Sequence, residues 1–178
     1  MIIALAGRRI DAPNAEIRRF PPENLELVRT RIRSFLQANP AALLISSAAC
    51  GADLIALEEA DAMGLQRRIV LPFHPQRFRV TSVTDRPGNW GVLYDRVIEQ
   101  AQRKGELVIL GCEDESAAYT AVNHAILDEA ERLARDSSDE TVAMVVWDGL
   151  PRGEEDYTKA FADEARRRRL PIIEVKTV

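Results

Sequence analysis

The sequence is poor in cysteine and histidine and has no excess of basic residues, and each shortage excludes a class of protein. Its two cysteines, Cys50 and Cys112, are too few for a disulfide framework and fit a reducing compartment. Its two histidines, His74 and His124, are far apart, and no Cys/His cluster has the spacing of a zinc site. The 24 basic and 28 acidic side chains give a net charge of −4, which disfavours a dedicated nucleic-acid-binding protein.

Long apolar stretches are also missing. No run approaches the roughly 18 apolar residues of a membrane span, and Met1–Arg9 lacks the order of charges and apolar residues of a signal peptide. The 178 residues are 46% hydrophobic and 29% charged, a balance typical of globular proteins. We therefore expect a cytoplasmic protein with one domain over residues 1–178, without a membrane association, and nothing in the sequence calls for a metal ion or a cofactor.

Six short apolar runs predict the strands of a sheet. Each has four to six residues, is rich in Ile, Val and Leu, and lacks alternation with polar residues, which is the pattern of parallel strands buried on both faces. The runs are Ile2–Ala6, Leu43–Ser46, Arg68–Leu71, Leu107–Leu110, Val142–Trp147 and Pro171–Val175.

Helical spacing of apolar residues fills most of the intervals between these runs. The predicted helices are Leu25 to Asn39, Ala52 to Gly64, Trp90 to Lys104, Ala118 to Arg135, and Tyr157 into Arg166–Arg169. Alternating strands and helices predict an α/β fold: a single Rossmann-like, doubly wound domain with a mostly parallel sheet of about six strands and helices on both faces.

The segment Pro72 to Asn89 is the exception, because it contains three prolines and has no period. We expect this segment to be irregular and to cover a pocket as a mobile lid. An ordinary surface loop is the alternative.

Ligands of open parallel sheets bind outside the carboxyl ends of the strands, so the residues that follow each strand are candidates. In the turn Ser46–Asp53, small residues lead to Gly51 at the start of a helix, where free backbone N–H groups suit a phosphate. The alternative is a tight turn that places Asp53 in the first helical turn, where acids are favoured. The turn matches neither the P-loop nor the dinucleotide fingerprint.

Two further side chains at strand ends have two interpretations each. Arg8 follows the first strand, where its guanidinium group could bind a phosphate through two hydrogen bonds or form an ordinary salt bridge. Trp147 ends the fifth strand, where its ring could stack on a base or a sugar or pack in the core.

Five short motifs stand in order along the chain: Gly7-Arg8, Gly51-Ala52-Asp53, Leu71-Pro72-Phe73, Ala118-Tyr119 and Val146-Trp147-Asp148-Gly149. This series resembles the SLOG domains, which are Rossmann-like relatives of the DprA single-strand DNA-binding proteins and of the LOG phosphoribohydrolases. The resemblance spans nearly the whole chain, from Met1 to about Val175.

The SLOG resemblance implies a site for a nucleotide or nucleotide-derived ligand, of the kind that senses nucleotide signals in bacteria. Related proteins are often dimers, so a homodimer is a further expectation. The ligand-binding residues that we predict are Gly7, Arg8, Ser46, Ser47, Gly51, Ala52, Asp53, Pro72, Phe73, Trp147, Asp148, Gly149 and Gly153. We expect the phosphate on the side of Arg8 and Gly51, and the sugar or base towards Trp147 and Asp148.

The LOG enzymes carry a Pro-Gly-Gly-x-Gly-Thr run and a catalytic glutamate where this chain has Leu150 to Thr158. Here Gly153 is retained, but Glu154, Glu155 and Asp156 would repel a phosphate. We therefore favour a nucleotide-binding sensor as the function, and the sequence leaves open whether the protein is also an enzyme.

Two alternatives remain. A nucleotide N-glycosidic-bond hydrolase or transferase would need a carboxylate near the anomeric carbon, and the candidates are Glu155, Asp148 and Asp114. The lesser alternative is DprA-like binding of single-stranded DNA, which the acidic composition disfavours.

Overall fold

The computed structural model describes residues 1–153 and 155–178, with the side chains of Glu115 and Ser116 left out of the description. Its six strands form one sheet in the order β4-β3-β2-β1-β5-β6, and every neighbouring pair is parallel. The predicted α/β fold with six strands is thereby confirmed, and each strand end lies within two residues of the predicted one. The strands are β1 (Ile2–Gly7), β2 (Leu43–Ser46), β3 (Gln66–Leu71), β4 (Leu107–Ile109), β5 (Thr141–Trp147) and β6 (Ile172–Lys176).

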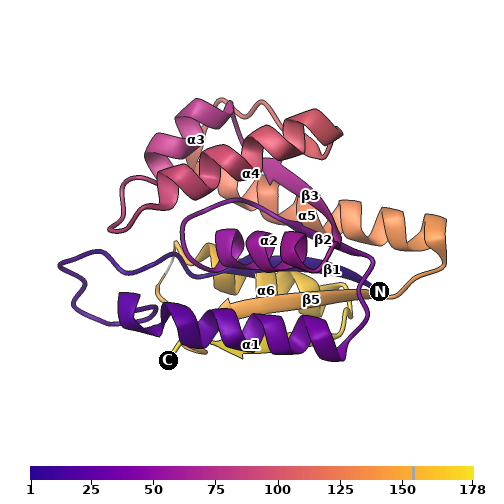
Figure 1. Ribbon diagram of the computed structural model, residues 1–178, viewed down its shortest axis with the longest axis horizontal. Coiled ribbons are helices and arrows are strands. Elements are labelled where there is room, and N and C mark those ends of the chain that lie inside the picture. Colours follow the sequence, from indigo (N-terminus) through magenta and orange to yellow (C-terminus); the bar gives the residue numbers. More distant parts are fainter. Residues whose placement is uncertain (154) are drawn as a thin grey trace.

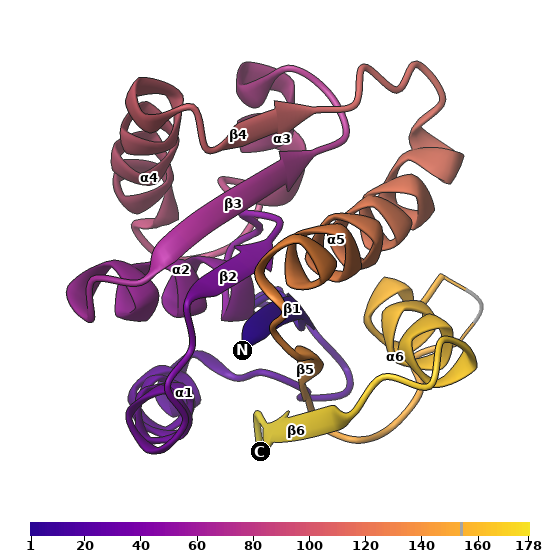
Figure 2. The same ribbon diagram turned by 90° about the vertical axis from the view of Figure 1, so that its right-hand side faces the viewer.

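Helices cover both faces of the sheet, as Figures 1 and 2 show. One face carries α1 (Leu25–Ala38), α2 (Ala52–Ala62), α3 (Pro75–Ser82) and α4 (Trp90–Lys104), with the short 3-10 turn η1 (Pro22–Asn24) ahead of α1. The other face carries α5 (Glu115–Ser137) and α6 (Tyr157–Arg167). In the described part of the chain, no helix is both long enough and apolar enough to cross a membrane.

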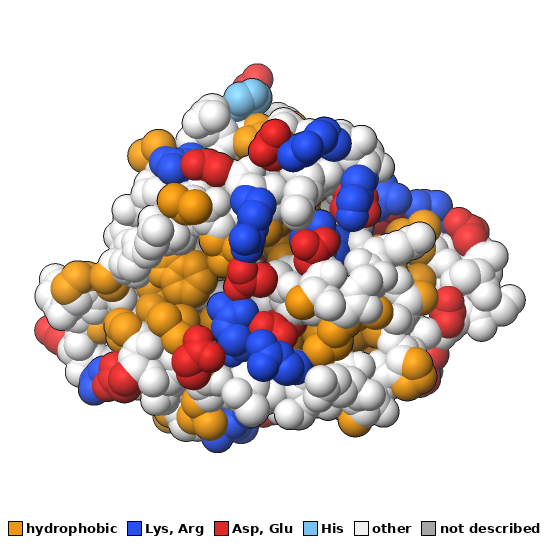
Figure 3. Space-filling view, in the orientation of Figure 1, with side chains coloured by type: hydrophobic (Ala, Val, Ile, Leu, Met, Phe, Trp, Pro, Cys, Tyr) orange, Lys and Arg blue, Asp and Glu red, His pale blue; other side chains and the backbone are white. Residues whose placement is uncertain are grey.

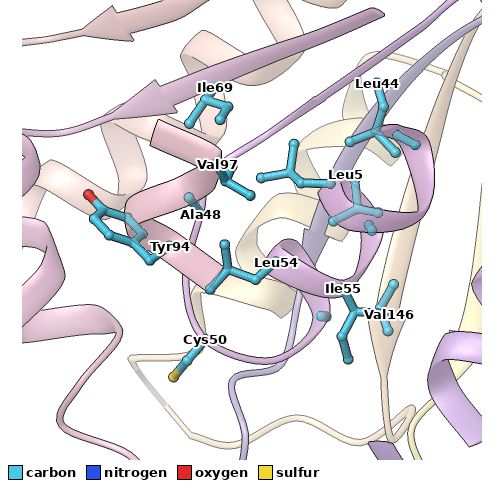
Figure 4. Packing of buried hydrophobic residues seen from close by; sticks show 14 of the residues in the cluster. Leu5, Leu44, Ala48, Cys50, Leu54, Ile55, Ile69, Tyr94, Val97 and Val146 are labelled. Carbon is cyan, nitrogen blue, oxygen red and sulfur yellow. The ribbon is translucent and has the colours of Figure 1, made fainter. Parts of the chain in front are cut away.

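The two faces have separate hydrophobic cores because side chains alternate along each strand. In β1, Ile3 and Leu5 pack in the core beneath α1, α2 and α4, whereas Ile2 and Ala4 pack in the core beneath α5 and α6. Figure 4 shows the larger core, where residues of α2 and α4 meet residues of β1, β2, β3 and β5. Central strands are therefore buried on both faces, as their continuous apolar runs predict.

Helix α3 lies inside the segment that the sequence predicts to be irregular, so that prediction was wrong for Pro75–Ser82. His74 Nδ1 accepts the N–H of Gln76, and Pro75 occupies the first helical position, where its fixed φ angle suits a helix. Phe78 is buried and stacks on Tyr94 with 6.1 Å between ring centroids. With eight residues and few apolar side chains, this helix is too short to show a hydrophobic period.

A network of ion pairs joins the outer surfaces of α1, α2 and α4. Glu59 on α2 is buried and accepts hydrogen bonds from Arg29 and Arg33 of α1, while Glu58 pairs with Arg29 and with Arg96 of α4. Figure 3 shows acidic and basic side chains side by side over the middle of this face. Burial raises the pKa of Glu59, but Arg33 and Arg29 outweigh that effect, and the pKa lies below its ordinary value.

Candidate functional site

The site follows from the strand order. β1 lies between β2 and β5, and the chain leaves β1 in one direction and later crosses back to the other side of it. The carboxyl ends of β1 and β5 therefore flank the topological switch point, where open α/β sheets bind ligands. A cavity of about 180 Å³ opens at this point. Its walls come from the end of β1, the β2–α2 turn, α3, α5 and the start of α6.

One wall of this cavity is aromatic. Tyr119 of α5 and Tyr157 of α6 lie with their ring centroids 5.1 Å apart, and Phe78 of α3 lines the same space. The hydroxyl of Tyr119 shares a hydrogen bond of 2.8 Å with the hydroxyl of Ser82. Asn123 donates its side-chain N–H to the carbonyl of Tyr157 at 2.8 Å, which joins α5 to the start of α6. These contacts hold the aromatic rings in place, so the wall offers a prepared surface for a flat ring.

The mouth of the cavity is rich in arginine. A second cavity, of about 340 Å³, shares Arg8, Arg9 and Arg152 with the first and adds Arg86 and Arg19. Within the part of the chain that the structure describes, the buried Nε atoms of Arg9 and Arg86 have no hydrogen-bond partner. Loss of hydration and the positive charges of Arg8, Arg86 and Arg9 lower the pKa of Arg152, although Asp156 opposes this shift. Carboxylates accompany these arginines: Asp85 pairs with Arg9 and lies 4.0 Å from Arg86 Nε, and Asp11 and Glu16 also line the second cavity. The feature that favours an anionic ligand is therefore the pair of unpartnered Nε atoms, not an excess of positive charge.

Arg8 itself has a full set of protein partners. Its guanidinium group donates to Asp148 at 3.1 Å, to the two oxygens of Asp156 at 2.5 and 2.9 Å, and to the carbonyl of Leu150 at 2.7 Å. The residue is only 4% exposed. Burial lowers the pKa of Arg8, but its bonds to Asp156 and Asp148 outweigh that effect and raise it. The salt-bridge interpretation thus describes Arg8, whose role is to join the end of β1 to the loop before α6.

The turn between β2 and α2 adopts the tight arrangement that was the alternative to an open phosphate cradle. Gly51 has φ of +105°, and a Cβ atom there would lie 2.8 Å from the carbonyl oxygen of Arg8 and from the N atom of Ile10. A glycine is therefore needed at position 51 because the backbone of Arg8 to Ile10, which follows β1, passes close to it, and not because a ligand does. Ala52 N–H donates to the carbonyl of Arg8 at 3.1 Å, so this helix N-terminus is partly occupied.

Gly7 and Ser46 also serve packing around the end of β1. A Cβ atom on Gly7 would lie 2.3 Å from the Cβ of Ala52, although Gly7 does line the cavity. Ser46 is fully buried, and its hydroxyl donates to the carbonyl of Leu5. Ser47, by contrast, lines the cavity.

Asp53 brings a carboxyl group from the first turn of α2 to the cavity. Among the described residues it is the only carboxyl that lines this space, and it is 5% exposed. Its Oδ2 accepts the N–H of Ala49 at 3.3 Å, whereas its Oδ1 has no hydrogen-bond partner among residues 1–153 and 155–178 as described. Burial raises the pKa of Asp53 to about 7, against the opposing effects of the N–H groups of Ala49 and Gly7 and the charge of Arg9.

The other predicted ligand-binding residues lie outside the cavity lining. Trp147 is 6% exposed, packs beneath α5 and α6, and donates its indole N–H to Glu174 at 3.2 Å. Asp148 is bound by Arg8 and Arg19. The remaining residues with this placement are Ser46, Gly51, Ala52, Pro72, Phe73, Gly149 and Gly153.

The carboxylates predicted for catalysis are also absent from the cavity lining. Glu155 and Asp114 are exposed, and Asp148 is paired as described above. Glu154, which we expected to repel a phosphate, lies outside the described residues. No group of three or more His, Cys, Asp or Glu side chains within 1–153 and 155–178 is placed to hold a metal ion.

Sequence reasoning missed Arg86 and Arg152 at the mouth, and the tyrosine pair. Arg86 and Arg152 occur in irregular segments far apart in the chain, and no local pattern indicates that they meet. Tyr119 belongs to the motif Ala118-Tyr119, which is only a weak indication of a binding role. Tyr157 stands out in the sequence only as an apolar position of a predicted helix.

Comparisons with known proteins reveal a structural likeness. No protein-family model matches the chain, and no curated protein matches it significantly. Among solved structures, the chain is similar to DNA processing protein A (DprA) from Streptococcus pneumoniae, with 13% sequence identity and a TM-score of 0.42. The match covers 97% of this chain and 58% of that protein. This likeness carries no assignment of function.

Proposed function

We propose that the chain binds a nucleotide or a nucleotide-derived ligand in the crevice between β1 and β5, as a binding or sensing module. One observation carries the proposal: Arg9, Arg86 and Arg152 converge at the mouth of a cavity with an aromatic wall, and the buried Nε atoms of Arg9 and Arg86 have no hydrogen-bond partner among the described residues. A phosphate group would supply the missing hydrogen-bond acceptors.

The volumes of the two cavities support a ligand of nucleotide size. Ligand pockets usually measure about 300–1,000 Å³, and the cavity of about 180 Å³ is small on that scale. It meets the cavity of about 340 Å³ at three shared arginines, and the two together fall within the range. We therefore place the base against Tyr119 and Tyr157 and the phosphate near Arg9 and Arg152. This placement replaces the one expected from the sequence, because Arg8 and Trp147 already have protein partners.

Two other functions use the same chemistry. A nucleotide N-glycosidase would need a carboxylate beside the sugar, and Asp53 is better placed for this than Glu155, Asp148 or Asp114. Binding of single-stranded DNA would use the aromatic wall for stacking and the arginines for the backbone. Neither alternative has an observation of its own in its favour.

A thermal-shift panel tests the proposal. The panel contains AMP, GMP, CMP, UMP, NAD, ADP-ribose, a cyclic dinucleotide and a short single-stranded DNA. A ligand at 100 times its Kd should stabilise the protein by about 2.7 kcal/mol. Chromatography after incubation shows whether a bound nucleotide also loses its base.

Matched variants locate the site. Arg9→Ala and Arg152→Ala should each weaken binding of the best ligand at least about tenfold, because each removes hydrogen bonds to a charged group. Arg103→Ala is the control, since Arg103 is exposed and pairs with Glu99 on the outside of α4. Failure of every compound to stabilise the protein, or wild-type affinity in both variants, would overturn the proposal.

A further inference from the structure

Asp53 carries a buried carboxyl oxygen, Oδ1, that has no hydrogen-bond partner among the described residues. The carboxyl group is nine-tenths buried, lines the cavity, and uses Oδ2 but not Oδ1 for hydrogen bonds within the described protein. Leaving a buried acceptor without a partner costs about 1–3 kcal/mol. Such an atom at a cavity wall is satisfied when a ligand brings a hydrogen-bond donor.

The part of the ligand that meets Asp53 has to be neutral. A phosphate against this carboxyl would add a second negative charge in a poorly hydrated space, which is unfavourable. The arginines at the mouth attract the anionic end of the ligand, and the tyrosine pair offers a stacking surface for a flat ring. The sugar, which lies between base and phosphate and carries hydroxyl donors, is the remaining part of a nucleotide.

We propose that Asp53 is the specificity-determining residue of this site, and that its Oδ1 accepts a hydrogen bond from a ribose hydroxyl, so that ribonucleotides are preferred over 2′-deoxyribonucleotides. This inference rests on the proposed function, which it refines by naming the sugar. Oδ2 stays on the N–H of Ala49 and holds the carboxyl group in its orientation.

The same contact couples binding to pH. Burial raises the pKa of Asp53 to about 7, so the carboxyl changes from protonated to ionised between about pH 6 and 8. The ionised form is the stronger acceptor, and the ribose preference should therefore increase with pH. The other charged or titratable residues that line this cavity come from the end of β1, from α5 and from the chain around the start of α6. They are Arg8, Arg9, Tyr119, Arg152 and Tyr157. The lining residues of α3, Phe78 and Ser82, carry no charge.

Asp53→Asn changes the hydrogen-bonding group that faces the cavity from an acceptor to a donor. The asparagine oxygen would take the place of Oδ2 at the N–H of Ala49, which leaves the NH₂ group at the position of Oδ1. An acceptor thereby becomes a donor without charge, while the volume stays nearly the same. The control is Asp136→Asn, since Asp136 is exposed on α5.

The experiment measures Kd by calorimetry for AMP, 2′-deoxy-AMP and ribose 5-phosphate at pH 6.0 and 8.0. At pH 8.0 the parent protein should bind AMP about tenfold more tightly than 2′-deoxy-AMP, and about threefold or less at pH 6.0. In Asp53→Asn the preference should fall to about threefold or less at both pH values, and in Asp136→Asn it should match the parent. Ribose 5-phosphate should show whether sugar and phosphate suffice for binding.

The outcomes separate the two proposals. Equal binding of AMP and 2′-deoxy-AMP by the parent, or a ribose preference that survives in Asp53→Asn, overturns the role of Asp53 and leaves nucleotide binding standing. Absence of binding for every compound overturns the proposed function, and the inference with it. The comparison of the two nucleotides across pH uses the parent protein alone, so it decides the question even where the variant does not fold.

Discussion

Asp53 should make the stability of the protein fall as the pH rises towards neutrality, even without a ligand. The carboxyl has an ordinary pKa of 3.8 and a pKa of about 7 in the folded protein, because it is buried. Between these values the folded state holds a proton that the unfolded state has released, so the free energy of unfolding decreases with rising pH. The free-energy cost of an ionised Asp53 in the folded protein is therefore complete above about pH 7, and it decreases as the pH falls.

The structure gives a magnitude for this effect. One pKa unit corresponds to about 1.36 kcal/mol, so the rise from 3.8 to about 7 costs about 4 kcal/mol when the carboxyl is ionised in the folded state. Between pH 5 and 8.5 the contribution of Asp53 to the free energy of unfolding should fall by about 2–3 kcal/mol. Asp53→Asn removes the ionisation but leaves an unpaired buried NH₂ group, which costs about 1–3 kcal/mol.

Urea unfolding at several pH values measures the difference. The free energy of unfolding of Asp53→Asn should depend on pH less steeply than that of the parent, by about 2–3 kcal/mol over this range. Equal m-values for the two proteins would show that the change lies in stability rather than in the unfolded state. Asp136→Asn, on the exposed side of α5, should follow the parent. Parallel profiles for Asp53→Asn and the parent would refute the argument that burial governs this carboxyl.

Three further predictions concern other residues. Arg8→Ala should destabilise the protein by about 1.5–3 kcal/mol in a denaturant titration, because it removes charged hydrogen bonds to Asp148 and Asp156, which keep Arg19 and two backbone N–H groups as partners; a loss below about 1 kcal/mol would contradict this. Gly51→Ala should lower the melting temperature even without a ligand, because of its φ of +105° and the 2.8 Å approach of backbone atoms, and an unchanged melting temperature would argue against the tight turn. Glu59→Gln should cost about 1–3 kcal/mol near pH 7 and progressively less as the pH falls below about 4.5, since its lowered pKa makes the ion pairs stabilising only above that range; a loss that is independent of pH would exclude the ionic account.

The fold could be predicted because each strand of a buried parallel sheet has a sequence pattern that can be recognised locally. Runs such as Val142–Trp147 are continuous and apolar, since both of their faces are buried, and the intervening helices carry a clear period. Helix α3 was not predicted because its stability comes from its N-terminal cap and from the packing of Phe78 on Tyr94. These contacts produce no helical spacing of apolar residues within eight residues.

The position of the candidate site could be predicted from the sequence, but only some of the residues that line its cavity could. The rule that ligands bind at the strand ends led to the β1 end and the β2–α2 turn, where Gly7, Ser47 and Asp53 line the cavity. Whether Arg8 binds a ligand or a carboxylate depends on Asp148 and Asp156, which lie 140 and 148 residues away in the sequence. No local pattern carries that information, and the same holds for the unpartnered oxygen of Asp53.

The central position of β1 has a consequence for synthesis of the chain on the ribosome. One neighbour, β2, follows β1 early, with Leu43 opposite Ile2, but the other neighbour is β5, with Thr141 opposite Ile2. Arg8 and Asp148 are 140 residues apart, and at about 5–20 residues per second the second neighbour emerges roughly 7–28 seconds later. Throughout this interval the middle of the nascent sheet has an open edge, which is a surface that pairs with other chains. Completion of β5 ends this exposure, so the edge of β1 that faces β5 stays unpaired for most of the synthesis of the chain.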